Sequence, residues 1–310
     1  MKKTLALALA ALASLVVTTA TYAGSTGFLR VHMVPTSNPG RPQGSRADCW
    51  IIELPDNTRM VVDIGDNGYY SAVTSRLTAL GISQVKYLVG THDHVDHIGD
   101  MNAFVSNGWV NNTTMYFPKG TINTQGPYYS ALITALNNKG MSMTKLKAGD
   151  YIVNTTYSGK TFKIRCLSPE NSKVDGGADD WGSENEASLV LKITYGAKSI
   201  LMQGDAYGNV EDSILAGPYG SEINLCQVIK AGHHGVNANG AISCREAYLD
   251  AAGCNKALIS NGDLAIDATI KARLQARNIH YFSTGFGDGY CYLETDGSSN
   301  WVESEAPQWP

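Results

Sequence analysis

The densest group of chemically active side chains lies at residues 91–99, which read Thr-His-Asp-His-Val-Asp-His-Ile-Gly. The potential metal ligands in this stretch are His92, His94, Asp96 and His97. Three neutral imidazoles and a carboxylate form a donor set that suits zinc or a similar divalent cation. Alternate residues of an extended segment point the same way, so we expect His92 and His94 to bind one cation. A turn into a helix then lets Asp96 and His97 reach a second.

The alternative for this stretch is a solvated polar loop without a metal. Ordinary loops rarely concentrate histidine in this way, and three of the seven histidines of the chain lie here. We therefore favour the metal site.

Three more segments end in polar groups that could complete a two-metal site. The apolar run 199–203 ends in Gly204-Asp205, and a carboxylate at a strand end can bridge two cations. The run 227–232 ends in His233-His234, either of which could be a ligand. Asp63 ends another apolar run, and we expect it to hold the histidine loop from outside the ligand set.

Apolar runs and turn residues predict the elements that position these groups. Strands are expected at 28–34, 49–54, 59–64, 86–89, 161–166, 188–195, 199–202, 257–260, 280–283 and 290–294. Helices are expected at 70–80, 128–138, 241–252 and 268–277. Strands mixed with helices in this order favour an α/β fold. We expect one domain at 24–310, with long loops at 35–48 and 171–186.

Residues 1–23 have the features of a secretory signal peptide. Lys2 and Lys3 precede an apolar run, which ends in small residues before Gly24. The expectation is a secreted or periplasmic protein of a bacterium, and the alternative is an uncleaved N-terminal anchor. No membrane span is expected once the signal is removed.

Charge and cysteine content limit the other function classes. The formal net charge is −4, so the chain lacks the basic field that holds nucleic acid non-specifically. Six cysteines in an exported chain suggest disulfides, with Cys244 and Cys254 close enough in sequence to pair; buried free thiols are the alternative.

Taken in order, these motifs resemble those of metallo-β-lactamase-fold hydrolases. The sequence has Asp-x-Gly at a strand end, then His-x-His-x-Asp-His, Gly-Asp and His-His-Gly. The closest resemblance is to the branch that contains the ComEC metallohydrolase domain and the secreted phosphorylcholine esterase. Segments 29–34, 50–55, 147–150, 188–191 and 283–289 share it, so that it covers nearly all of residues 28–297.

The resemblance implies a four-layer αββα sandwich with two divalent cations, zinc or manganese, at one edge. His92 and His94 would hold the first cation, Asp96, His97 and one of His233 or His234 the second, and Asp205 would bridge them. Asp96 and Asp205 would thereby be catalytic. The implied activity is an exported hydrolase, a phosphodiesterase that uses a metal-bridging hydroxide. Hydrolysis of carboxylic esters, lactones or β-lactams is the alternative, and a non-catalytic exported binding protein is a further one.

Two positions depart from the family pattern. Residues 183–187 stand where true β-lactamases carry another histidine, which leaves the first cation short of a ligand unless Glu184 or substrate supplies one. Val236 stands where the branch usually has serine after His-His-Gly.

The substrate follows from the resemblance only as a class. We expect a small-molecule or cell-envelope phosphoester, whereas the acidic charge disfavours nucleic acid. A choline ester would need an aromatic cage for its quaternary ammonium group. Candidate walls of such a cage are Trp181, Tyr69, Tyr70, Tyr128, Tyr129 and Tyr207.

Overall fold

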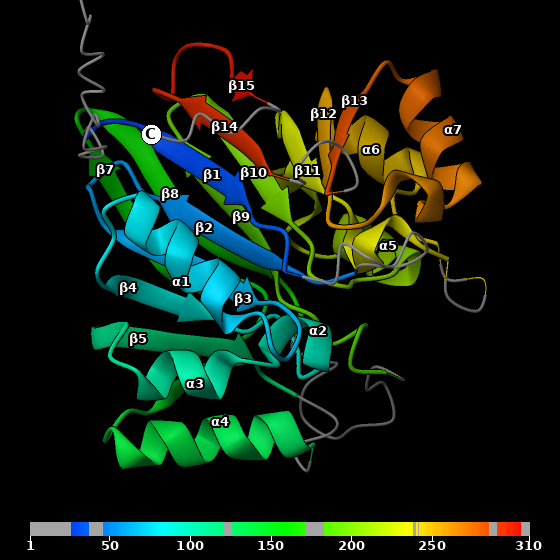
Figure 1. Cartoon of the computed structure of the whole chain (residues 1–310). Helices are drawn as coiled ribbons and strands as arrows, with labels where there is room; N and C mark the ends of the chain where they lie inside the picture. The colour runs from blue at the N-terminus through cyan, green and yellow to red at the C-terminus, as the bar shows by residue number, and fades with distance from the viewer. Residues whose placement is uncertain are drawn as a thin grey trace, which may run out of the picture.

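Two β-sheets form the frame of the protein (Figure 1). The structure is a computed structural model that describes residues 26–36, 46–120, 126–170, 183–237, 240, 242–284 and 290–304. The predicted signal peptide and most of the predicted loop at 171–186 lie outside these residues. No helix in the described ranges is long and apolar enough to span a membrane.

The first sheet has eight strands in the order β15-β14-β1-β2-β3-β4-β5-β6. The strands are β1 (Leu29–Met33), β2 (Cys49–Glu53), β3 (Arg59–Ile64), β4 (Val85–Val89), β5 (Val110–Pro118), β6 (Met143–Leu146), β14 (Cys291–Thr295) and β15 (Val302–Ser304). Strands β3 to β6 pair in parallel, whereas the other neighbours are antiparallel.

The second sheet has seven strands in the order β13-β12-β11-β10-β9-β8-β7. They are β7 (Tyr151–Tyr157), β8 (Lys160–Ser168), β9 (Val190–Tyr195), β10 (Lys198–Met202), β11 (Val228–Lys230), β12 (Lys256–Ile259) and β13 (His280–Ser283). Here β10 to β13 are parallel.

Helices cover the outer face of each sheet (Figure 1). The first sheet packs against α1 (Tyr70–Ala79), α3 (Met101–Ser106) and α4 (Pro127–Asn138), and the short α2 (Val95–Ile98) lies at its edge. The second sheet packs against α5 (Gly208–Ala216), α6 (Glu246–Ala252) and α7 (Ala268–Ala276). Short 3-10 helices are η2 (Gly220–Ile223), η3 (Gly232–Gly235) and η4 (Asp263–Ala265). The layers are therefore helix, sheet, sheet and helix, as the αββα prediction required.

Alternation along the strands explains this layering, because successive side chains of a strand point to opposite faces. In β10, Ile200 and Met202 face the core between the sheets, whereas Leu201 faces the helices. In β3, Met60 and Val62 face that same central core. Both faces of each sheet are apolar where they are covered, which is why these strands are continuous apolar runs.

The parallel strands bring the predicted site residues to one edge. Asp63 is the penultimate residue of β3, and the histidine loop follows β4. Asp205 follows β10, and His233 and His234 follow β11. Since carboxyl ends of parallel strands share an edge of a sheet, each sheet contributes half of the site.

Most predicted elements are present, with shifted boundaries. The helix predicted at 241–252 begins only at Glu246, and the strand predicted at 188–195 begins at Val190. The six cysteines are buried and are not paired in disulfides, so the suggested disulfide between Cys244 and Cys254 is not formed.

Truncation in the core between the sheets tests this packing. Leu191 is fully buried there, whereas Leu225 is 77% exposed. We expect Leu191→Ala to lower the free energy of unfolding by about 2–5 kcal/mol, because it leaves a cavity among side chains that cannot close it. The matched change Leu225→Ala should cost less than about 0.5 kcal/mol. Urea unfolding curves measure both, and equal losses would contradict the assigned core.

Candidate metal centre

The Asp63 carboxylate fixes the histidine loop. Its Oδ1 accepts the backbone N–H of Thr91 at 2.8 Å, and its Oδ2 accepts the Thr91 hydroxyl at 2.7 Å. The same Oδ2 lies 2.7 Å from Nδ1 of His97. An Nδ1–H that donates to a carboxylate leaves Nε2 of the ring as a lone pair, which is the form that binds metal. Asp63 therefore contacts both the start and the end of the histidine loop.

His97 and His234 face each other across the two sheets. Their Nε2 atoms are 3.2 Å apart, and both rings are buried. His234 Nδ1 lies 3.1 Å from the Ser260 hydroxyl and 3.5 Å from Oδ1 of Asp48, so its Nε2 also points inward. Two lone pairs at this distance would repel each other, so a proton or a metal cation has to lie between the two nitrogens.

The carboxylates of Asp205 and Asp96 lie close to the Nε2 atoms of these histidines. Oxygens of Asp205 lie 3.3 Å from Nε2 of His97 and 3.3 Å from Nε2 of His234. Oδ2 of Asp96 lies 3.2 Å from Nε2 of His234. This first group combines two imidazoles with two carboxylates, a donor set suited to a divalent cation.

A second group lies beside the first, with the His92 and His97 ring centroids 4.1 Å apart. Nε2 of His92 is 3.0 Å from Nδ1 of His94 and 3.9 Å from Oδ2 of Asp205. His92 is fully buried, whereas His94 is exposed. Oδ2 of Asp205 is therefore near nitrogens of both groups, 3.3 Å from Nε2 of His234 and 3.9 Å from Nε2 of His92.

A glycine turn sets the position of Asp205. Gly204 has φ +50°, and a Cβ at this position would lie 2.9 Å from Cβ of Thr91 and 3.1 Å from Cβ of Ser188. The backbone N–H of Asp205 donates to the Ser188 hydroxyl at 3.1 Å. The Asp205 turn thus packs directly against Thr91 at the start of the histidine loop. This close approach requires glycine at position 204.

The paired histidines differ in position. Both have left-handed backbone conformations, with φ of 47° for His233 and 52° for His234. His234 points into the first group, whereas the His233 side chain is 15% exposed and its Nε2 lies 3.9 Å from Oδ2 of Asp205. The His233 ring packs edge-on against Tyr207, 5.0 Å between centroids. The geometry thus favours His234 as the ligand and places His233 at the rim.

The sequence interpretation missed Asp48 and Lys230. Asp48, His97, Asp205 and His234 each place a potential ligand atom within 4.8 Å of the others. However, Asp48 lies on the Nδ1 side of both imidazoles, 3.8 Å from Nδ1 of His97, and its Oδ2 is 2.6 Å from the Lys230 ammonium group. Asp48 therefore lies behind the two histidines, on the side away from their facing Nε2 atoms. Lys230 lies within the apolar run 228–231. A lysine inside a buried strand needs a carboxylate partner, so this position could have indicated a buried ion pair.

The electrostatics show a surplus of negative charge at the centre. Burial alone would lower the pKa of His97, but the Asp205 and Asp63 carboxylates outweigh it and raise that pKa to about 10. Burial and the neighbouring His97 hold the pKa of His92 well below its usual value. Oδ1 of Asp205 is buried and accepts no hydrogen bond. These residues fit a divalent cation, which would replace the proton drawn to His97.

Glu184 and Val236, the two departures from the family pattern, are both buried. Glu184 lies beside Asp93. Its carboxylate is also close enough to Lys145 to raise the pKa of that lysine, against the effect of burial, which lowers it.

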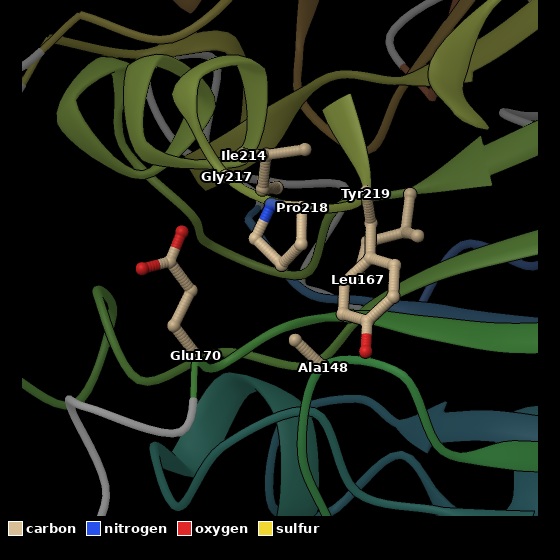
Figure 2. Close-up of a pocket in the computed structure, with 7 residues that line it drawn as sticks. All are labelled: Ala148, Leu167, Glu170, Ile214, Gly217, Pro218 and Tyr219. Atoms are coloured by element: carbon tan, nitrogen blue, oxygen red, sulfur yellow. The ribbon is translucent and has the colours of Figure 1, made fainter. Parts of the chain in front are cut away.

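A cavity of about 220 Å³ is separate from the centre (Figure 2). It is lined by Ala148, Leu167, Glu170, Ile214, Gly217, Pro218 and Tyr219. None of the predicted site residues belongs to this lining.

Removing the charge of Asp63 tests the assignment of the loop. We expect Asp63→Asn to weaken zinc binding about 10–100-fold, because His97 loses the acceptor that sets its orientation. Asp56→Asn is the matched control, since Asp56 accepts two hydrogen bonds from Thr58 in a turn between β2 and β3. Competition with a chromophoric chelator measures both affinities, and unchanged binding in the Asp63 variant would contradict the assignment.

Comparison with known proteins agrees with this geometry. A family model described as the metallo-beta-lactamase superfamily matches residues 43–118, which include Asp63 and the histidine loop. ComE operon protein 3 of Bacillus subtilis (strain 168) is 29% identical over 187 residues, which make up 60% of this chain. The chain spans only about a fifth of the length of that relative, 21%.

A solved structure shows the same fold. The metallo-beta-lactamase fold protein YhfI from Bacillus subtilis superposes with a TM-score of 0.51, covering 82% of this chain and 95% of its own, at 12% identity. Together with the matched family model and the similarity to ComE operon protein 3, this confirms the resemblance found in the sequence. Residues 43–118 therefore match the metallo-β-lactamase superfamily, and the chain shares the fold of a metallo-β-lactamase-fold protein.

Proposed function

We propose that the protein is an exported metal-dependent hydrolase that cleaves phosphodiesters. The observation that carries this proposal is the pair of Nε2 atoms of His97 and His234, 3.2 Å apart, which Asp96 and Asp205 flank. Buried imidazoles and carboxylates converge in this way where positive charge, from bound protons or from a metal cation, offsets the repulsion between the carboxylates. The match to the metallo-beta-lactamase superfamily model supports a role of that cation in hydrolysis.

The proposed ligand sets follow the two groups. His92 and His94 of the second group would hold one divalent cation, and Asp96, His97 and His234 of the first group would hold the other. Asp205, which is near both groups, would be shared by the two cations. When bound, two such cations activate water near neutral pH and stabilise the oxygen that leaves in an in-line displacement.

The remaining contribution of the chain is orientation. Asp63 and Ser260 fix the ring positions of His97 and His234 from their Nδ1 sides. Asp205 is held by its backbone contact to Ser188. Preorganised donors of this kind need little rearrangement when substrate binds.

Substrate reaches the centre from the side of its exposed groups. His94 is exposed, and the Asp96 side chain is 28% exposed, whereas His92, His97 and His234 are buried. At this rim, His233 packs against Tyr207, whose hydroxyl accepts a hydrogen bond from Asn185 at 2.6 Å. Of the suggested cage aromatics, Tyr207 is thus next to the centre, while Trp181 lies outside the described ranges.

Phosphodiesters are the proposed substrates because a two-cation centre suits displacement at phosphorus. The net charge of −4 favours a small-molecule or cell-envelope phosphoester over nucleic acid. Export is proposed from the signal-like residues 1–23, with 24–310 as the mature single domain.

Hydrolysis assays test the substrate class. The protein is given bis(p-nitrophenyl) phosphate and p-nitrophenyl phosphorylcholine with zinc or manganese, and a chelator serves as control. Chelator-sensitive cleavage of either supports the proposal, and preference for the second selects choline esters. If zinc binds and neither is cleaved, the phosphodiester proposal fails, and p-nitrophenyl acetate, a lactone and nitrocefin are the next substrates.

Replacing the bridging carboxylate tests the mechanism. We expect Asp205→Asn to lower kcat at least about 100-fold and to reduce bound metal, because the amide cannot bridge two cations. Asp212→Asn is the control, since Asp212 is half exposed and pairs with Arg245 away from the centre. Activity and metal content are measured on the same preparations, and retained activity in the Asp205 variant would refute the assignment.

A further inference from the structure

Lys230 places a positive charge inside the metal centre. Its side chain is 1% exposed, and its Nζ lies 2.6 Å from Oδ2 of Asp48 and 3.6 Å from Oδ1 of Asp205. The same ammonium group donates a hydrogen bond to the Gly204 carbonyl at 2.5 Å. Lys230 therefore contacts both the turn that carries Asp205 and the carboxylate behind His234.

The position is unusual among the buried cationic side chains. The other buried Arg and Lys side chains in the described ranges are Arg30 of β1 and Arg76 of α1. They contact Tyr292, Glu294 and Tyr290, which lie in or next to β14 of the first sheet, whereas Lys230 is in the second sheet. Asp48, Asp63 and Asp205 are all buried at the centre, so their charges repel each other at short range. Lys230 is the one buried lysine of the described residues, and its ammonium group offsets part of this negative charge.

We propose that Lys230 is the internal counter-cation of the metal centre, which stabilises its carboxylates before metal binds and then opposes metal binding. The proposal rests on the metal centre of the proposed function. A cation that lowers the energy of the metal-free site must also repel a second cation that enters it. The two effects are linked, since an interaction that stabilises the metal-free protein more than the loaded one weakens binding by the difference between the two stabilisation free energies.

A purely structural lysine would behave differently. If Lys230 only filled space and joined Asp48 to Gly204, its loss would destabilise the metal-free and the metal-loaded protein equally. Metal affinity would then stay the same, or fall if Asp205 lost its position. The sign of the change in affinity therefore separates the two roles.

The experiment compares four proteins: wild type, Lys230→Met, Asp48→Asn and the double variant. Zinc affinity is measured by competition with a chromophoric chelator, and thermal melts are recorded with chelator and with saturating zinc. Lys192→Met is the control, because Lys192 is a partly buried lysine of β9 that donates to the carbonyls of Glu222 and Asn224. We expect that control to leave zinc affinity within about twofold of wild type.

The expected result is that Lys230→Met binds zinc at least about tenfold more tightly than wild type, since a unit charge has been removed from beside the cation. Its melting temperature falls in chelator and recovers in zinc. Weaker binding, or an equal loss of stability in both conditions, overturns the proposal.

The double variant keeps the test decisive if Lys230→Met does not fold because Asp48 is left unpaired. It should bind zinc more tightly than Asp48→Asn alone, because only Lys230 differs between them. Equal or weaker binding refutes the counter-cation. If the wild type itself binds no zinc or manganese, the proposed function fails rather than this inference.

Discussion

The three hydrogen bonds that Asp63 accepts are the constraint on which the centre depends. They fix Thr91 at the start of the histidine loop and His97 near its end. Asp63 itself has φ 58°, a conformation that is uncommon for a residue other than glycine. The chain accepts this strained backbone at the end of β3 because the buried carboxylate is satisfied by three donors.

The rest of the centre is built outward from this loop. Gly204 allows the Asp205 turn to pack on Thr91, and Leu189 donates its backbone N–H to the Thr91 carbonyl at 2.9 Å, so the second sheet is joined to the loop of the first. Asp48 reaches Ser260 across the same boundary. The charged and polar groups of the site form an inner and an outer shell. The inner shell contains the Nε2 atoms of His97 and His234, and the outer shell contains Asp63, Asp48 and Lys230.

How far the sequence predicts this structure depends on how local each signal is. The spacing of His92, His94, Asp96 and His97 is local, and the strands that end at Asp63 and before Asp205 are apolar runs. The first half of β5, by contrast, is the polar stretch 111–114, and α5 begins at Gly208, a poor helix former. These elements form because tertiary packing of Met115, Phe117, Val210 and Ile214 decides them. Asp48 was missed since its partners, Ser260, Lys230 and His234, are far away in sequence.

Division of the centre between the two sheets has a consequence for the motions of the protein. His92, His97 and Asp96 belong to the first half of the chain, whereas Asp205 and His234 come from the second half. A cation held by ligands from both halves would connect the two sheets, so the sheets could not separate without releasing the cation. Amide hydrogens on β3 and β10, although they lie in different sheets, would then exchange with solvent as one cooperative unit when metal is bound.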